Sequence, residues 1–260
     1  MRKLIKTLPN AIMVKTRLDK LLLERGLAPS RERAQALILA GKVLVNQQKI
    51  EKAGAAVDSE AELRLLGDDL RYVGRGGLKL EAALEHWRID VQLRNCLDVG
   101  ASTGGFTDCL LQHGAARVIA VDTGHGQIDF RLRQDPRVRL LEKTNARYLT
   151  RATLGEEVSL VVMDVSFISA TKVLPAVIAA AFPQPAAGAC ELLVLVKPQF
   201  EAGREEVGKG GIVRSEAAQI ASVASVSACL ASRGCTALES IPSPILGAEG
   251  NREFLLHAKY

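Results

Sequence analysis

The chain contains a glycine-rich turn that separates a short apolar strand from a helix, and few folds accommodate this order. Residues 95–106 read NCLDVGASTGGF, and we expect the helix that follows to continue to about His113. A second apolar strand, Arg117 to Val121, ends in Asp122, about twenty residues after the turn. This order is typical of a βαβ unit that binds a nucleotide, in which the acid accepts the hydroxyls of a ribose.

The turn itself indicates which nucleotide is bound. A dinucleotide requires bare backbone against its pyrophosphate, and Ser102 occupies the position of the second glycine in that fingerprint. S-adenosylmethionine has no phosphate, so we favour it over NAD. A second glycine-rich stretch, residues 203–210, spells GREEVGKG, but it lacks the hydroxyl residue that holds Mg²⁺ in a P-loop. We therefore interpret it as a loop able to close over substrate rather than as an ATP site.

Strands and helices continue to alternate after Asp122. The pattern predicts strands at 138–141, 158–163, 192–196, 237–241 and 253–258, with helices at 127–133, 169–181 and 215–231. Such alternation indicates an α/β fold with a Rossmann-like, doubly wound parallel sheet. The last two strands flank a loop rich in proline and glycine, and we expect them to form an antiparallel hairpin.

Polar residues that follow the predicted strands are candidates for chemistry, because ligands bind beyond the carboxyl ends of parallel strands. Asn145, Asp164 and Lys197 stand at such positions. Asp164 begins DVSF, without the prolines common where amino groups are methylated, so an amino-group target is disfavoured. Lys197 follows a strongly apolar strand, and burial beside another cation would favour a neutral amine that can act as a base. Lys79 stands near the start of a predicted helix, where the dipole disfavours a cation.

The positive charge of the chain is concentrated near its N-terminus. Residues 1–60 contain 12 Lys and Arg against 6 Asp and Glu, whereas residues 61–260 contain 22 against 23. A helix ends near Gly26, Ser30 caps a second helix that ends before Gly41, and strand residues follow from Val43. This stretch resembles the S-four-type RNA-binding module, a small α+β unit. Its expected RNA contacts are Arg17, Lys20, Arg31, Arg33, Lys42 and Lys49, joined by Arg75 further along.

Seven further motifs make the resemblance specific across nearly the whole chain: GRGGLKL, LDVGASTGGFTDCLL, AVDTGHGQ, TNAR, DVSFIS, VKPQFE and GNREFLL. In these motifs the chain resembles the TlyA, or hemolysin A, family of S-adenosylmethionine-dependent ribosomal RNA 2′-O-methyltransferases, whose catalytic domain is FtsJ-like. The resemblance implies a catalytic set of Lys79, Asp164, Lys197 and Glu253. It implies cytidine in rRNA as the target and cofactor contacts at Gly100, Ala101, Ser102, Gly104, Gly105, Phe106, Asp122, Asn145 and Asp164.

We therefore expect four segments: an N-terminal tail over 1–14, an S-four-type domain over 15–72, a glycine-rich connector over 73–80 and a Rossmann methyltransferase domain over 81–260. Lys197 would take or orient the proton of a ribose hydroxyl, Lys79 would assist it, and Asp164 and Glu253 would hold the two lysines. The expected partners are ribosomal RNA or ribosomal subunits.

Composition narrows the classes of protein to which the chain can belong. Hydrophobic residues make up 48% of the chain and charged residues 24%, which are globular values. The five cysteines form no paired framework and the four histidines are scattered, so we expect reduced thiols, a cytoplasmic location and no metal site. No apolar stretch reaches membrane-spanning length and no signal peptide is evident. A non-catalytic RNA-binding assembly factor and a secreted hemolysin remain the alternatives.

Overall fold

The computed structural model describes residues 15–28, 30–66, 71–183, 190–247 and 249–260. The chain divides into two compact units, unit 1 (Met1–Asp69) and unit 2 (Leu70–Tyr260). This division comes three residues before the boundary predicted from the sequence. The predicted tail over 1–14 lies outside the described residues.

Unit 1 is a small α+β domain. Helix α1 (Leu18–Glu24) packs on α2 (Arg31–Leu39), and the Ser30 side chain accepts a hydrogen bond from the Arg33 amide, as expected for the helix cap. Its strands are β1 (Lys15–Arg17), β2 (Val43–Val45), β3 (Gln48–Lys49), β4 (Ala56–Asp58) and β5 (Leu63–Leu65). β1 pairs with β4, and β3, β2 and β5 form a second small sheet. Leucines of both helices and valines of β2 form a separate core.

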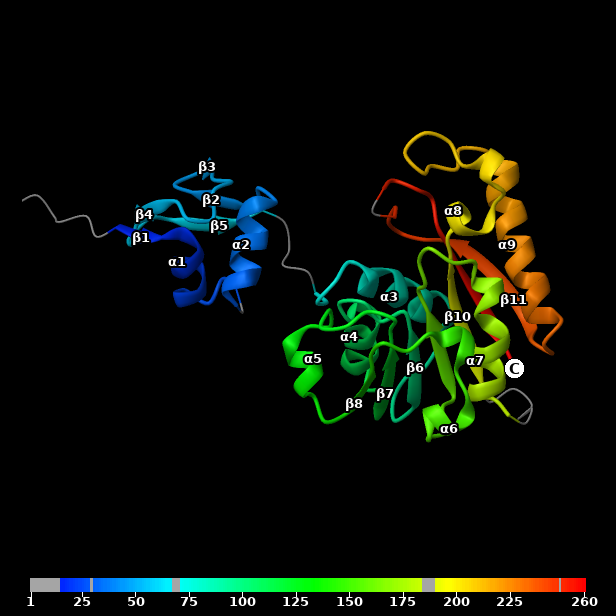
Figure 1. The fold of residues 1–260 in the computed structure, drawn as a ribbon. Coiled ribbons are helices and arrows are strands. Elements are labelled where there is room, and N and C mark those ends of the chain that lie inside the picture. The colour runs from blue at the N-terminus through cyan, green and yellow to red at the C-terminus, as the bar shows by residue number, and fades with distance from the viewer. Residues whose placement is uncertain (1–14, 29, 67–70, 184–189, 248) are drawn as a thin grey trace, which may run out of the picture. The chain divides into compact units, whose positions relative to one another are not determined.

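Unit 2 is built on a seven-stranded sheet in the order β11-β12-β10-β9-β6-β7-β8 (Figure 1). Its strands are β6 (Asn95–Val99), β7 (Arg117–Val121), β8 (Val138–Leu141), β9 (Leu160–Met163), β10 (Glu191–Val196), β11 (Thr236–Pro242) and β12 (Phe254–Lys259). β6 to β10 are parallel, whereas β12 runs antiparallel to both β10 and β11. The predicted Rossmann-like sheet with an antiparallel final hairpin is therefore confirmed.

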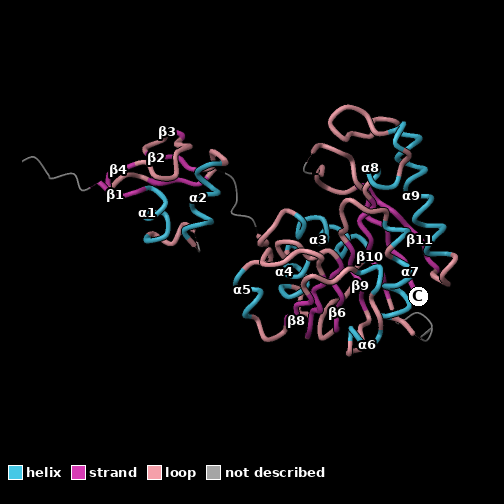
Figure 2. Tube along the Cα trace, viewed as in Figure 1, coloured by secondary structure: helices cyan, strands magenta, loops and turns pink. Residues whose placement is uncertain are grey.

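Alternating residues of the central strands face two different hydrophobic cores. In β9, Val161 and Met163 belong to one core, whereas Leu160 and Val162 belong to the other. This follows from the two-residue period of a strand whose two faces are both covered. Helices α7 (Leu174–Ala181) and α9 (Glu216–Ala231) contribute to the first core, and α3 (Gly76–Trp87), α4 (Gly105–Gln112) and α5 (Phe130–Gln134) contribute to the second (Figure 2).

The helix predicted over 169–181 is interrupted. The chain forms a 3₁₀ helix, η2 (Ala170–Lys172), and then α7, with Pro175 in the first turn of α7. Proline has no N–H to donate and is accepted in a first turn, so a new helix starts there. The structure also contains short elements that the sequence pattern did not reveal: η1 (Ala146–Tyr148), α6 (Arg151–Leu154), α8 (Pro198–Glu201) and η3 (Arg204–Glu206).

The glycine-rich segment predicted as a connector over 73–80 belongs to unit 2. Helix α3 begins at Gly76, and the buried Tyr72 side chain packs in the same core as α3 and α4. A Cβ placed on Gly105 would lie 3.1 Å from the Gly77 amide nitrogen and 3.2 Å from the Gly74 carbonyl oxygen. The glycines therefore allow two backbones to pack directly together, which fixes α3 beside the start of α4.

Candidate functional site

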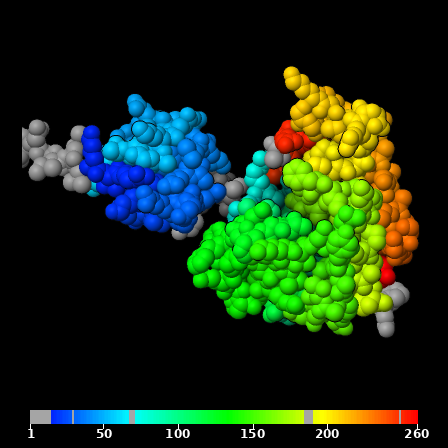
Figure 3. All heavy atoms as spheres, in the orientation of Figure 1, coloured from blue at the N-terminus to red at the C-terminus, as the bar shows by residue number. Residues whose placement is uncertain are grey.

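The carboxyl ends of β6, β7, β8 and β9 surround a cavity of about 530 Å³. This size is within the roughly 300–1,000 Å³ of small-molecule sites, and the position is the strand-order switch where such sheets bind ligands. Its described lining residues are Val99, Gly100, Ser102, Val121, Asp122, Thr123, Gly124, Gln127, Thr144, Asn145, Ala146, Asp164, Val165, Ser166, Phe167, Ile168 and Val173. In Figure 3, the segments around residues 125–150 (green) and 200–215 (yellow) lie at the visible surface of unit 2.

The turn after β6 and the acid after β7 are tied together at the cavity wall. Asp122 accepts a hydrogen bond from the Ser102 amide at 2.8 Å and another from the Gly124 amide at 2.7 Å. The two bonds use different carboxylate oxygens, and each oxygen retains a free lone pair for a ligand hydroxyl. Asp122 thus lies at the cavity wall, beyond the carboxyl end of β7, and its contact with a ribose stays a prediction.

Gly100 brings the backbone of this turn against the segment that follows β9. Its φ is +87°, and a Cβ added there would lie 2.3 Å from the Asp164 carbonyl oxygen. Only glycine fits both the conformation and the close approach.

The residues predicted to bind the cofactor fall into two groups. Gly100, Ser102, Asp122, Asn145 and Asp164 line the cavity. Four predicted cofactor contacts are not among the described lining residues: Ala101, Gly104, Gly105 and Phe106. Ala101 and Phe106 belong instead to the hydrophobic core that also contains residues of α3.

Lys197 and Asp164 form an ion pair at the edge of the cavity. Lys197 Nζ lies 2.6 Å from Asp164 Oδ1 and donates a hydrogen bond to Ser166 Oγ at 2.7 Å. The Lys197 side chain is only 11% exposed. A cation is thus held close to the cavity by one carboxylate and one hydroxyl.

Lys79 and Glu253 form a second ion pair, with 2.5 Å between Lys79 Nζ and Glu253 Oε2. Both side chains are buried. The ion pair with Glu253 explains why a lysine lies near the start of α3, where the helix dipole disfavours a cation. The strand register brings the two pairs to the same end of the sheet, because Val196 of β10 pairs with Phe254 of β12 and the adjacent Lys197 and Glu253 extend that register by one residue.

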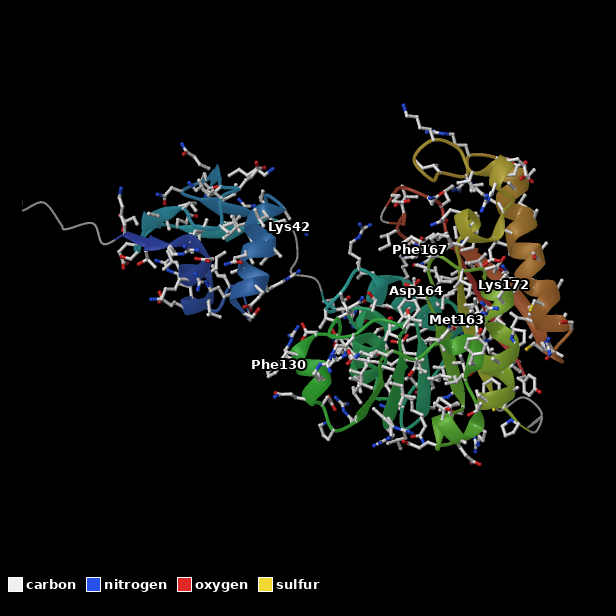
Figure 4. All side chains as sticks on the ribbon, in the orientation of Figure 1. Lys42, Phe130, Met163, Asp164, Phe167 and Lys172 are labelled. Carbon is white, nitrogen blue, oxygen red and sulfur yellow. The ribbon has the colours of Figure 1, made fainter. Side chains whose placement is uncertain are left out.

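The cavity residues that were not predicted as site residues include Ser166 and Phe167. Ser166 and Phe167 lie in the segment after β9, and Phe167 is 90% exposed at a φ of +63° (Figure 4). Its ring packs against Phe200 with 5.4 Å between centroids. Their position just after Asp164, which itself follows β9, was the available signal, but an aromatic side chain after a strand usually indicates packing.

Asp98 lies beneath the turn and is fully buried. Thr107 Oγ1 of α4 donates a hydrogen bond to Asp98 Oδ2 at 2.6 Å, while Asp98 Oδ1 has no described hydrogen-bond partner. Burial raises the pKa of Asp98 to about 7, and the nearby Asp164 adds to that rise.

The basic residues of unit 1 are anchored in different ways. Arg17 and Arg31 both pair with Asp19, whose carboxylate is fully buried, and the bond from Arg17 holds the Asp19 pKa well below its usual range. Lys20 and Lys49 are more than half exposed and lie beside Glu24 and Glu51.

The remaining predicted RNA contacts lie in both units. Arg33 is on α2 and Lys42 precedes β2 in unit 1 (Figure 4). Arg75 belongs instead to unit 2, where it is exposed and donates a hydrogen bond to the Leu246 carbonyl oxygen.

Two features of other protein classes are missing from the described residues. No helix among them has the length and apolarity needed to cross a membrane. No cluster of three or more His, Cys, Asp or Glu side chains in the part that the structure describes is arranged to hold a metal ion.

The doubly wound sheet, the antiparallel β12 and the cavity at the switch point define unit 2 as a Rossmann-like methyltransferase domain. Residues 72–260 match the family of FtsJ-like methyltransferases, and residues 16–63 match the S4 domain. The chain belongs to the FtsJ-like methyltransferases and, within them, to the TlyA family.

Similar proteins support this assignment. The 16S/23S rRNA (cytidine-2′-O)-methyltransferase TlyA of Mycobacterium tuberculosis is 44% identical over 93% of this chain and 89% of that protein. Hemolysin A of Brachyspira hyodysenteriae is 40% identical over 93% of this chain and 98% of that protein. A solved structure named as a hemolysin from Streptococcus thermophilus is 43% identical with a TM-score of 0.72, covering 95% of this chain and 89% of that one.

Proposed function

We propose that this protein transfers a methyl group from S-adenosylmethionine to a ribose 2′-hydroxyl of ribosomal RNA, with cytidine as the target nucleoside. The observation that carries this proposal is the Lys197–Asp164 pair at the edge of the cavity, with the buried Lys79–Glu253 pair at the same end of the sheet. The identity to an rRNA cytidine-2′-O-methyltransferase over nearly the whole chain supports the choice of substrate.

The cavity residues fit S-adenosylmethionine. Asp122 has free lone pairs for the two ribose hydroxyls, and the valine and isoleucine side chains of the lining provide an apolar surface for a base. Gly100 and Asn145 offer backbone and amide groups to the amino-acid part. When bound, this cofactor supplies an electrophilic methyl group.

The lysines prepare the hydroxyl that receives the methyl group. Lys197 orients the 2′-hydroxyl and, as the neutral amine left when its own proton has passed to solvent, takes the hydroxyl proton while the oxygen attacks the methyl carbon. The O–CH3 bond forms as the S–CH3 bond breaks, and S-adenosylhomocysteine leaves. Asp164 holds Lys197 in place through the ion pair. The buried Lys79, fixed by Glu253, adds positive charge to this end of the sheet and positions the ribose. Alignment of nucleophile and methyl group provides much of the acceleration.

Unit 1 supplies affinity for the RNA. Its basic side chains contact phosphates and select RNA with little reading of base sequence. Ribosomal RNA as substrate places the activity in the cytoplasm.

Transfer of labelled methyl from S-adenosylmethionine to ribosomal subunits tests the proposal. The subunits are taken from a strain that lacks this gene, and nuclease digestion locates the label. We expect the label on a 2′-O-methylated cytidine. Cofactor binding without transfer to either subunit or to free rRNA would contradict the substrate, and a chain that binds no cofactor would instead be a non-catalytic assembly factor. Lysis of washed red cells by the pure protein would support a hemolysin.

Substitution Lys197→Ala tests the role of the catalytic lysine. We expect the rate of methyl transfer to fall by about 100-fold or more, because general acid–base catalysis contributes roughly 10²–10⁴-fold. Binding of S-adenosylhomocysteine, measured by calorimetry, should change little.

The matched control is Lys172→Ala, which removes an exposed lysine on η2 that lies apart from Asp164 (Figure 4). This variant should methylate at the rate of the unsubstituted chain. Undiminished transfer by Lys197→Ala would remove Lys197 from the mechanism.

A further inference from the structure

The segment between β9 and η2 carries five of the residues that line the cavity, and both of its ends are fixed. At its start, the Asp164 amide donates a hydrogen bond to the Val99 carbonyl oxygen of β6 at 2.9 Å. At its end, Ser169 caps η2 through a hydrogen bond from the Thr171 amide. We call residues 164–169 the site loop.

Glu201 holds the far end of the site loop. Its carboxylate accepts a hydrogen bond from Ser169 Oγ at 2.6 Å and another from the Ala170 amide at 2.6 Å. Burial raises the Glu201 pKa while these two bonds oppose the rise. Partial burial of a carboxylate is unfavourable unless its oxygens accept hydrogen bonds. Both oxygens of Glu201 accept from one short segment, and hydrogen bonds to a carboxylate are strong, so they hold that segment in place.

Glu201 and Lys197 are joined by a single rigid element. Lys197 is the residue before α8, and Glu201 is its last residue. Residues 197–201 therefore contact the site loop and the start of η2 at three successive places. These are Lys197 on Asp164 and Ser166, Phe200 on Phe167, and Glu201 on Ser169 and Ala170.

The middle of the site loop is strained. Phe167 adopts a φ of +63°, a conformation that is unfavourable for a non-glycine residue and persists only when surrounding contacts impose it. Release of the Glu201 end would let Phe167 leave this conformation. Ser166 and Asp164 would then lose their present approach to Lys197.

We propose that Glu201 is a positioning residue for methyl transfer, which acts by clamping the site loop so that Asp164 and Ser166 meet Lys197. Glu201 touches neither the substrate nor the reacting atoms. The inference rests on the proposed 2′-O-methylation.

The donors and acceptors of a glutamine side chain predict that Glu201→Gln keeps the clamp. In Glu201→Gln, the side-chain oxygen can accept from the Ala170 amide, and the amide group can donate to Ser169 Oγ, whose own proton can turn to Thr171 Oγ1, 2.6 Å away. In Glu201→Ala both bonds are lost. The two variants remove the same charge and differ in the clamp.

The experiment compares these variants in full-length protein by methyl transfer to ribosomal subunits, by S-adenosylhomocysteine binding and by hydrogen exchange of peptides spanning the site loop. For Glu201→Ala we expect kcat to fall about 10- to 100-fold, because a misplacement of about 1 Å has effects of this size. We expect affinity for S-adenosylhomocysteine to change by no more than about threefold, and amides of the site loop to exchange faster. Glu201→Gln should return kcat to within about threefold of the unsubstituted chain.

Two further variants complete the test. Glu85→Ala removes an exposed carboxylate on α3, outside both the described cavity lining and residues 203–210, and should change none of these measurements. Ser169→Ala removes one of the two bonds with little change in volume, so it should lower kcat even if Glu201→Ala fails to fold.

The clamp, its role in positioning and the contribution of charge can each be overturned by a different result. Unchanged exchange of the site loop in Glu201→Ala would overturn the clamp, and faster exchange with unchanged kcat would overturn its role in positioning. A loss of kcat in Glu201→Gln equal to that in Glu201→Ala would assign the effect to charge rather than to hydrogen bonding. If the unsubstituted chain transferred no methyl to a 2′-hydroxyl, the proposed function would fail, whereas the exchange measurement would still decide the clamp.

Discussion

Asp98 shows how a single buried group makes stability depend on pH. Its pKa is raised from 3.8 to about 7 by burial, so in the unfolded chain it loses its proton near pH 4 and in the folded chain near pH 7. Between these values the folded state binds more protons than the unfolded state. The contribution of Asp98 to stability is therefore fully present below about pH 4 and is lost as the pH rises through about 7.

We predict that Asp98→Asn removes this dependence. The amide oxygen still accepts from Thr107, and no charge has to be buried. The Tm of the variant minus that of the unsubstituted chain should increase by roughly 5 °C between pH 5 and pH 8, measured by calorimetry. The exposed Asp90→Asn serves as a control and should show no such trend. A constant difference for Asp98→Asn across this range would mean that Asp98 is ionised throughout.

At the level of elements, the turn after β6 and the site loop after β9 depend on each other through one glycine. Because a Cβ on Gly100 would overlap the Asp164 carbonyl oxygen, Gly100→Ala forces one of the two segments to move. Both line the cavity, and Asp164 also holds Lys197. A steric change at one element is thus transmitted directly to the Asp164–Lys197 ion pair.

We expect Gly100→Ala to weaken S-adenosylhomocysteine binding by about tenfold or more and to abolish methyl transfer, because an overlap with backbone cannot be relieved by a side-chain rotation. Calorimetric titration checks the affinity. Gly26→Ala in unit 1 is the matched control for cofactor affinity, since Gly26 has a φ of +68° but no heavy atom within 4 Å of an added Cβ. Equal effects of both substitutions would attribute the loss to backbone conformation alone.

The whole molecule divides its tasks between two units of different charge. Residues 1–60 carry an excess of basic residues, whereas the remainder of the chain is close to neutral. Under the proposed function, unit 1 contributes an electrostatic affinity for RNA that salt weakens, and unit 2 contributes a cavity lined by both polar and apolar side chains.

We predict that the double substitution Lys20→Gln and Lys49→Gln lowers affinity for rRNA and reduces the slope of log affinity against log salt by about 2, since each phosphate contact contributes close to one. Filter binding at several salt concentrations measures this slope, and S-adenosylhomocysteine binding should not change. Lys259→Gln, at the exposed end of β12 away from Glu253, should leave the slope as it was. An unchanged slope in the double variant would place the RNA contacts elsewhere.

The sequence alone determined the α/β class, the order of the main strands, the antiparallel final hairpin and the basic N-terminal domain. It could do so because these features depend on local periodicity, on turn residues and on charge, all of which can be read from neighbouring residues. The spacing from the glycine turn to Asp122 likewise fixed a βαβ unit and the edge of the sheet where a ligand binds.

Tertiary structure alone decided which residues meet at the carboxyl ends of the strands. Nothing in the local pattern around Lys79 shows that Glu253, 174 positions later, neutralises it, or that the glycines before Lys79 belong to a packed helix rather than to a connector. The clamp from Glu201 to Ser169 and the exposure of Phe167 depend equally on long-range register. Pairing between strands distant in sequence sets these contacts, and such pairing is a property of the whole sheet.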